Sequence, residues 1–132
     1  MAVKVLSICV VGFTFVAAIL IASDLRAFLD VPSILVVIGP VIASISAKHG
    51  LEGFKELFRE GENQSKILHT MGVTAILAGA IGAMIGSVII LGSLSDKSAL
   101  GPAFAIALLT LLYGLLIFLF TTLLSTKNFG EK

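Results

Sequence analysis

The sequence lacks tryptophan, has one tyrosine and one cysteine, and contains few charged residues. Charged side chains make up 13% of the 132 residues, about half the share found in soluble domains. Cys9 has no second cysteine to pair with, and its place in an apolar run predicts the role of a small apolar filler. No basic patch with interleaved aromatic residues occurs, which argues against a nucleic-acid partner.

Sequence signatures of enzymes are missing as well. The chain has no phosphate-binding loop, no cluster of zinc ligands, and no Ser–His–Asp set outside its apolar runs. We therefore predict no catalytic residues, no metal site, no cofactor and no enzymatic activity.

The sequence does contain long apolar runs. Hydrophobic residues make up 58% of the chain, and they gather in four long runs. A membrane helix needs about 20 mostly apolar residues. The first run exceeds the apolar core of a typical signal peptide, so we interpret it as a span. The prediction is an all-α, multi-pass protein of the lipid bilayer, a single membrane domain over 1–132 with four spans at about 5–23, 31–47, 68–94 and 102–126.

Two further predictions concern residues 31–66. The second run opens at Val31-Pro32, which suits a helix start, and Gly39-Pro40 predicts a kink within it. The polar segment 48–66 then carries apolar residues at helical spacing, which predicts a short amphipathic helix lying on the cytoplasmic membrane surface.

The distribution of positive charge predicts the topology. Cytoplasmic loops are enriched in lysine and arginine. With both termini in the cytoplasm, only Arg26 and Lys97 lie outside, and the remaining cations lie inside: Lys4, Lys48, Lys55, Arg59, Lys66, Lys127 and Lys132.

Small residues form a stripe on each of the last two spans. On the third span they fall on about one third of the circumference at 100° per residue, and Gly82-x-x-x-Gly86 has the spacing that lets membrane helices approach closely. Two interpretations follow from this periodicity. The stripes pack together within one subunit, or they face a subunit interface or the bore of an oligomer.

The central parts of the spans contain no Asp, Glu, Lys or Arg. A membrane ion or proton relay usually depends on such a residue. This chain alone therefore cannot supply an intramembrane carboxylate.

The hairpin of the last two spans resembles the MotA/TolQ/ExbB proton-channel family, and the MotA/PomA flagellar stator branch in particular. The matching residues of the hairpin are Gly79-x-x-Gly82-x-x-x-Gly86, Leu94 to Pro102, Ala105 to Thr110, and Leu112-Tyr113-Gly114. A second match, Asp30 to Gly39, resembles the family's Pro-Ser-x-Leu-Ile-Val-x-Gly-Gly, with Pro40 in place of the last glycine.

The resemblance implies a bacterial inner-membrane homopentamer around a dimer of single-span B-type subunits, each supplying an intramembrane Asp. Proton flow would then turn the pentamer and drive rotation or other mechanical work. Eight positions are implied to line the pore or face the partner: Gly79, Gly82, Ala83, Gly86, Ala107, Thr110, Leu111 and Gly114. Six positions are implied to be structural: Pro32, Ser33, Gly39, Gly101, Pro102 and Tyr113.

The chain departs from the family pattern in three ways. Only about 20 residues separate the second and third spans, where flagellar members carry a large cytoplasmic insertion. Ala83 stands where sodium-driven members have Thr, which favours H⁺ over Na⁺. Leu111 stands where the family shares a fourth-span Thr, so either the adjacent Thr110 supplies the hydroxyl or the pathway is drier.

Three functions are compatible with these observations. A stator-like channel subunit is the first, and a non-conducting oligomeric scaffold of the same fold is the alternative. An unrelated small-molecule transporter is the third, but Gly39-Pro40 has no matching helix break in the second half of the chain.

Overall fold

A computed structural model of the chain describes residues 2–22, 25–59, 61–92, 94–95 and 97–125. These residues form helices joined by turns and short irregular segments, and none of them lies in a β-strand. The predicted all-α class is confirmed for this part of the chain.

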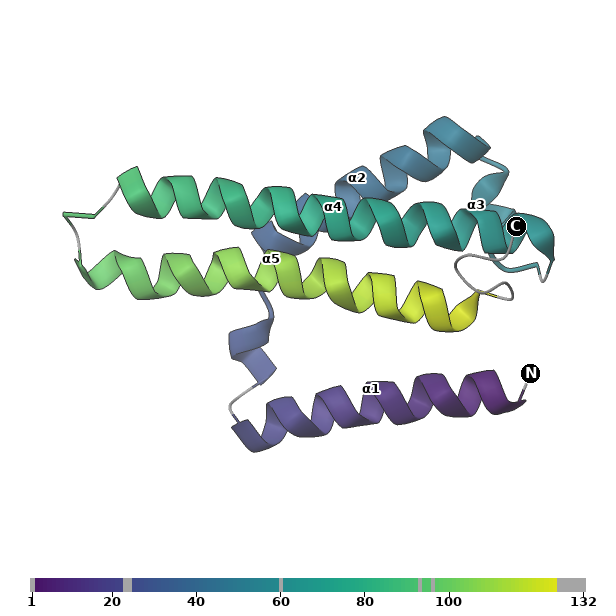
Figure 1. The fold of residues 1–132 in the computed structure, drawn as a ribbon, viewed down its shortest axis with the longest axis horizontal. Helices are drawn as coiled ribbons and strands as arrows, with labels where there is room; N and C mark the ends of the chain where they lie inside the picture. The colour runs from purple at the N-terminus through teal and green to yellow at the C-terminus, as the bar shows by residue number, and fades with distance from the viewer. Residues whose placement is uncertain (1, 23–24, 60, 93, 96, 126–132) are drawn as a thin grey trace.

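Helices α4 (Glu62–Gly92) and α5 (Lys97–Leu124) form a long antiparallel hairpin that dominates the molecule (Figure 1). Their contact is the most extensive between any two helices of the structure. Within the described residues, three helical stretches are long and apolar enough to cross a bilayer: Val31–His49, Glu62–Gly92 and Leu100–Leu124. Val5–Ile21 is apolar but shorter.

Helix α2 (Val31–His49) begins with a side-chain cap. The Asp30 carboxylate accepts a hydrogen bond from the backbone N–H of Ser33 at 2.9 Å, which satisfies one of the unpaired donors at the helix start. Pro32 stands in the first turn, where its missing N–H has no helical partner. The helix continues through Pro40 and ends at His49, and the capping residue Gly50 has a φ of 65°, which favours glycine.

The core lies where α2 crosses the N-terminal half of α4. Its buried residues come from those two helices: Val37, Val41, Ile45, Ile67 and Ala75. Two polar contacts secure the same end. His49 Nε2 lies 3.1 Å from Thr70 Oγ1, and Ser65 Oγ lies 2.6 Å from Ser125 Oγ, which ties α4 to the end of α5.

The expected short amphipathic helix within 48–66 is reduced to a single turn. The segment holds only the single-turn helix α3 (Gly53–Glu56) between turns, and α4 already starts at Glu62. Phe54 and Leu57 pack against the core, whereas Leu51 and Phe58 are exposed. Half of the apolar face therefore packs on the core, and the other half stays exposed.

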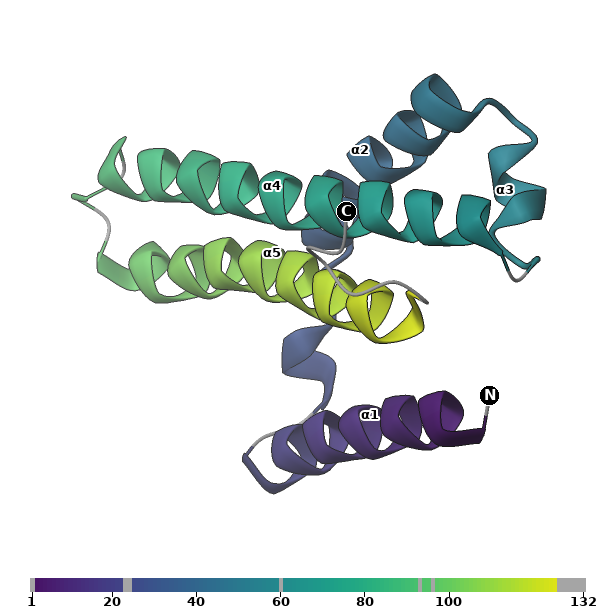
Figure 2. The same ribbon diagram turned by 45° about the vertical axis from the view of Figure 1, so that its right-hand side comes forward.

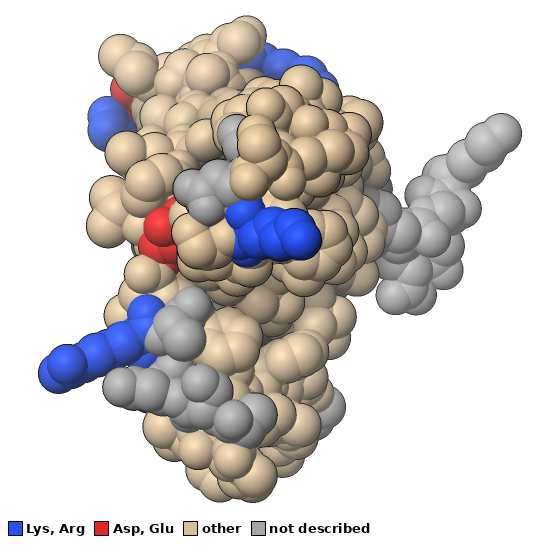
Figure 3. Space-filling view, turned by 90° about the vertical axis from the view of Figure 1, so that its left-hand side faces the viewer, with Lys and Arg blue, Asp and Glu red and all other residues tan. Residues whose placement is uncertain are grey.

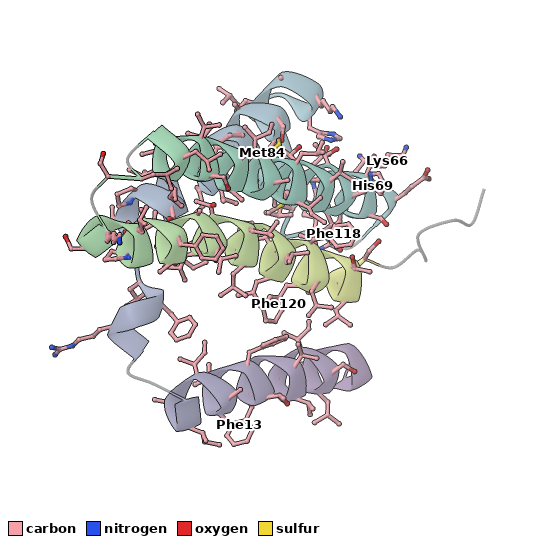
Figure 4. The ribbon with its side chains drawn as sticks, turned by 60° about the vertical axis from the view of Figure 1, so that its left-hand side comes forward. Phe13, Lys66, His69, Met84, Phe118 and Phe120 are labelled. Atoms are coloured by element: carbon pink, nitrogen blue, oxygen red, sulfur yellow. The ribbon has the colours of Figure 1, made fainter. Side chains whose placement is uncertain are left out.

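Helix α1 (Ala2–Ala22) lies apart from the other helices, and the short 3₁₀ helix η1 (Leu25–Phe28) connects it to α2 (Figures 1 and 2). It approaches α5 where Gly12 faces the ring of Phe120. Figure 4 shows Phe120 on α5 extending toward α1, and Phe13 on the opposite side of α1, where it is 76% exposed.

The helices differ from the expected spans chiefly at their ends. Helix α5 starts at Lys97, so Pro102 lies inside the helix and not at its start. Pro102 is the sixth residue of α5, beyond the first four N–H groups that lack helical partners, so it removes one backbone hydrogen bond from the second turn. Ser23 and Thr126, where the first and fourth spans were expected to end, lie outside the described residues, as do the cytoplasmic cations expected at Lys127 and Lys132.

Candidate functional site: the α4–α5 hairpin

The contact between α4 and α5, here called the seam, is built from backbone and very small side chains. A Cβ atom placed on Gly79 would lie 2.7 Å from the carbonyl oxygen of Thr110 and 3.2 Å from the Cα of Gly114. One placed on Gly114 would collide with the carbonyl oxygen of Ala75. Such distances leave no room for a side chain, so the glycines are what allow the two helices to approach this closely.

The seam continues toward the α4–α5 turn. A Cβ atom on Gly82 would lie 3.1 Å from the Cβ of Thr110 and 2.9 Å from Cγ1 of Val36 on α2. One on Gly86 would lie 2.6 Å from the Cβ of Ala107. Gly82 therefore marks the place where α2, α4 and α5 meet.

The hydroxyl of Thr110 is enclosed in the seam. Thr110 is only 4% exposed, and its Oγ1 donates a hydrogen bond to the carbonyl oxygen of Ala107 at 2.8 Å. Within the chain, the hydroxyl of Thr110 is therefore covered by α4.

The side of the hairpin opposite α2 is here called the open side. Helical geometry places residues three and four apart on one face. Counted from the seam and away from α2, that face carries the following described residues, none of them buried: His69, Ile76, Ala80, Ala83 and Ser87 on α4, and Phe104, Leu108, Leu111, Leu115, Phe118 and Thr122 on α5.

The eight positions implied to line a pore or face a partner thus fall into two groups. Six lie in the seam, all of them buried except the partly exposed Gly86: Gly79, Gly82, Gly86, Ala107, Thr110 and Gly114. Only Ala83 and Leu111 reach the open side. The assignment of all eight positions to a pore or a partner surface stays a prediction.

A hollow of about 540 Å³ adjoins the open side along α5. Its walls are apolar and come from η1 and from one face of α5: Phe28, Ala105, Leu108, Leu109, Leu111, Leu112 and Leu115. The outward face of α4 is also apolar, with Met84 exposed there (Figure 4). Figure 3, which views the molecule from the left-hand side of Figure 1, shows a mostly uncharged surface with charged residues in small separate groups.

A hydrogen-bonded polar cluster of Asp30, Ser33 and Tyr113 joins the start of α2 to the middle of α5. Tyr113 Oη donates a hydrogen bond to the carbonyl oxygen of Phe28 and accepts one from the backbone N–H of Asp30 at 3.2 Å. Ser33 Oγ lies within hydrogen-bond distance of the Asp30 carboxylate and, at 3.3 Å, of the carbonyl oxygen of Ile106.

Two of the six positions implied to be structural, Ser33 and Tyr113, belong to this polar cluster. A Cβ atom added to Gly39 or to Gly101 would have no atom within 4 Å, so neither glycine marks a close approach within the chain. Sequence reasoning missed Asp30 and Phe28. Asp30-x-Pro-Ser could have been recognised as a capping signal, but the bond to Phe28 uses a backbone carbonyl and leaves no trace in the sequence.

Comparison with known proteins agrees with this architecture. Residues 50–129, more than half of the chain, match the MotA/TolQ/ExbB proton channel family. The chain belongs to this family.

Similarity to three relatives places the chain near the MotA/PomA branch. "Motility protein A" of Cereibacter sphaeroides is 54% identical over 39 residues, 30% of this chain and 15% of the relative. "Motility protein A" of Borreliella burgdorferi is 48% identical over 50 residues, 38% of this chain and 19% of the relative. "Chemotaxis protein PomA" of Vibrio alginolyticus is 41% identical over 51 residues, 39% of this chain and 20% of the relative. The matches therefore span at most about a fifth of each relative.

Proposed function

We propose that the chain is a stator-like ion-channel subunit of the bacterial inner membrane. In this proposal it crosses the membrane four times with both termini in the cytoplasm, and five copies surround a dimer of single-span B-type subunits. Proton flow through the complex drives rotation or other mechanical work. Family membership and the three membrane-capable helices support this function.

The observation that carries the proposal is the chemistry of the open side. Between Ser87 near one end and the polar pair His69 and Thr122 near the other, its residues are Ile76, Ala80, Ala83, Phe104, Leu108, Leu111, Leu115 and Phe118, all of them apolar. Ions lose hydration in such a path unless polar groups replace it. A partner that brings its own carboxylate supplies the missing group, which is why this chain needs a second subunit.

The direct test is reconstitution with that partner. We expect a single-span protein with an intramembrane Asp, encoded beside this gene, to co-purify in unequal stoichiometry, and native mass spectrometry would count the copies. Liposomes carrying both proteins and a pH-sensitive dye should take up protons, whereas liposomes with either protein alone should not. Failure to bind such a partner, together with no partner-dependent uptake, would rule the function out.

Leu111 and Thr110 give a matched pair of variants for the same assay. Leu111→Thr places a hydroxyl on the open side, and we expect it to raise proton uptake several-fold. Thr110→Val keeps the volume of a side chain already covered by α4, so uptake should stay within about twofold, with a stability loss of about 1 kcal/mol for the lost hydrogen bond. Loss of uptake in a well-assembled Thr110→Val complex would instead assign the ion-handling hydroxyl to Thr110.

A non-conducting oligomeric scaffold is the second candidate. Leu111 on the open side and the covered hydroxyl of Thr110 favour it, because neither offers a polar contact to an ion. The same liposomes decide between the two functions, since a scaffold binds its partner without partner-dependent uptake.

A further inference from the structure

Ser87 is the exposed hydroxyl at the end of the open side nearest the α4–α5 turn. Its Oγ donates a hydrogen bond to the carbonyl oxygen of Ala83, 2.8 Å away and one helical turn back. With its hydrogen used in this way, the oxygen keeps lone pairs that can accept a hydrogen bond from outside the helix.

The level of Ser87 follows from the seam. Gly82 lies beside Thr110, and Gly86 lies beside Ala107. At a rise of about 1.5 Å per residue, Ser87 stands roughly 6 Å from Ala83, toward the turn. It is thus about one helical turn beyond Ala83. Leu111 lies deeper, because its Cα is beside Gly79, eight residues or about 12 Å from Ser87. The resemblance places a hydroxyl of sodium-driven members at Ala83 and a shared hydroxyl at Leu111, and this chain has neither.

Two other exposed hydroxyls, Ser95 and Ser98, lie at the turn itself, outside the open side. The hydroxyls farther along α5 are placed differently. Thr110 and Thr121 are each 4% exposed and lie in the seam. Thr122 is on the open side but near its cytoplasmic end, and its Oγ1 donates to the carbonyl oxygen of Phe118 at 2.7 Å. Among the described residues of the open side, Ser87 is therefore the hydroxyl that an ion entering from the turn meets first.

We propose that Ser87 supplies the oxygen that positions the partner's carboxyl group while that group takes up its proton. The proposal rests on the proposed function. In this step a hydrated proton gives H⁺ to the carboxylate, forming a neutral carboxylic acid and water. Ser87 Oγ accepts a hydrogen bond from the new acid O–H and stays a neutral hydroxyl throughout. The neutral acid can then pass the apolar stretch at Ala83 and Leu111, which a carboxylate would cross only at high cost.

The simpler explanation is that Ser87 only satisfies its own hydroxyl. Serine and threonine in helices often donate to the carbonyl four residues back. Thr14 on α1 shows this arrangement, with an exposed Oγ1 that donates to the carbonyl oxygen of Val10 at 2.8 Å. Because Thr14 is not on the hairpin, it offers a matched control with the same local bond.

The experiment compares four variants in complex with the single-span partner, in the liposome assay. Ser87→Ala should lower proton uptake at least fivefold, with unchanged partner co-purification. Ser87→Thr, which keeps the hydroxyl, and Thr14→Val should stay within twofold of the unsubstituted complex. Adding Ala83→Thr to Ser87→Ala restores a hydroxyl one turn away on the same side, and uptake should recover.

The possible failures are distinct. An unsubstituted complex without partner-dependent uptake would overturn the proposed function, and the role of Ser87 with it. An active complex in which Ser87→Ala conducts normally would overturn only the role of Ser87. Equal losses in Ser87→Ala and Thr14→Val would also overturn it, because the effect would then follow from the local helix bond.

Discussion

Gly114→Ala should separate α4 from α5 and destabilise the chain by about 2–3 kcal/mol, the upper range for overpacked sites. The added methyl group would collide with the carbonyl oxygen of Ala75 and lie 3.2 Å from the Cα of Gly79. Both neighbours are backbone atoms, so no side chain can rotate away to make room. This cost exceeds the gain of about 1 kcal/mol that alanine brings over glycine in a helix interior.

Gly101→Ala is the matched control, since it lies in the same helix with no atom within 4 Å of its Cβ position. We expect it to be neutral or stabilising by up to about 1 kcal/mol. Denaturation in mixed micelles, followed by circular dichroism, would rank the two variants against the unsubstituted chain. If both raise stability equally, α4 and α5 do not touch backbone to backbone at Gly114.

Tyr113→Phe should cost about 1–3 kcal/mol while leaving the hairpin intact. The phenylalanine ring fills the same space, but the carbonyl oxygen of Phe28 and the N–H of Asp30 both lose their hydrogen-bond partner. Partly buried backbone groups without partners are more costly than the net value of the bonds they replace. The start of α2 should loosen first.

Two measurements check this expectation. Hydrogen exchange at the Asp30 amide should accelerate in Tyr113→Phe, and the denaturation midpoint should fall. Thr122→Val serves for comparison, because its hydroxyl bonds only within α5. We expect that variant to lose less than about 0.5 kcal/mol. Unchanged exchange at Asp30 would show that the Tyr113 hydroxyl does not hold the loop.

Much of the fold can be predicted from the length of the apolar runs and from the spacing of the glycines. The runs over 31–47, 68–94 and 102–126 coincide with α2, α4 and α5 to within about six residues, because hydropathy reports burial in lipid directly. The small-residue stripes predict close packing, but periodicity cannot tell an intrachain seam from the wall of a bore. The rotation of α4 relative to α2 decides this, and it depends on contacts such as Gly82 with Val36.

Two features of the structure could not be predicted from sequence patterns. The bond from Tyr113 to Phe28 joins residues 85 positions apart and uses a main-chain acceptor, which any residue could supply. The segment after α2 looked like one amphipathic helix because its apolar residues share a face. The core takes only Phe54 and Leu57 from that face, and the helix is reduced to a single turn.

The glycine seam also has a mechanical consequence. Side chains that interlock across an interface can change rotamer and let two helices slide, whereas backbone in direct contact has almost no such freedom. The α4–α5 pair should therefore behave as one stiff rod rather than as two jointed helices. At about 1.5 Å per residue, the 28 residues of α5 make this rod roughly 42 Å long. In the proposed stator-like function, a twist applied near Ala83 would reach the end of the rod at Thr122 with little loss.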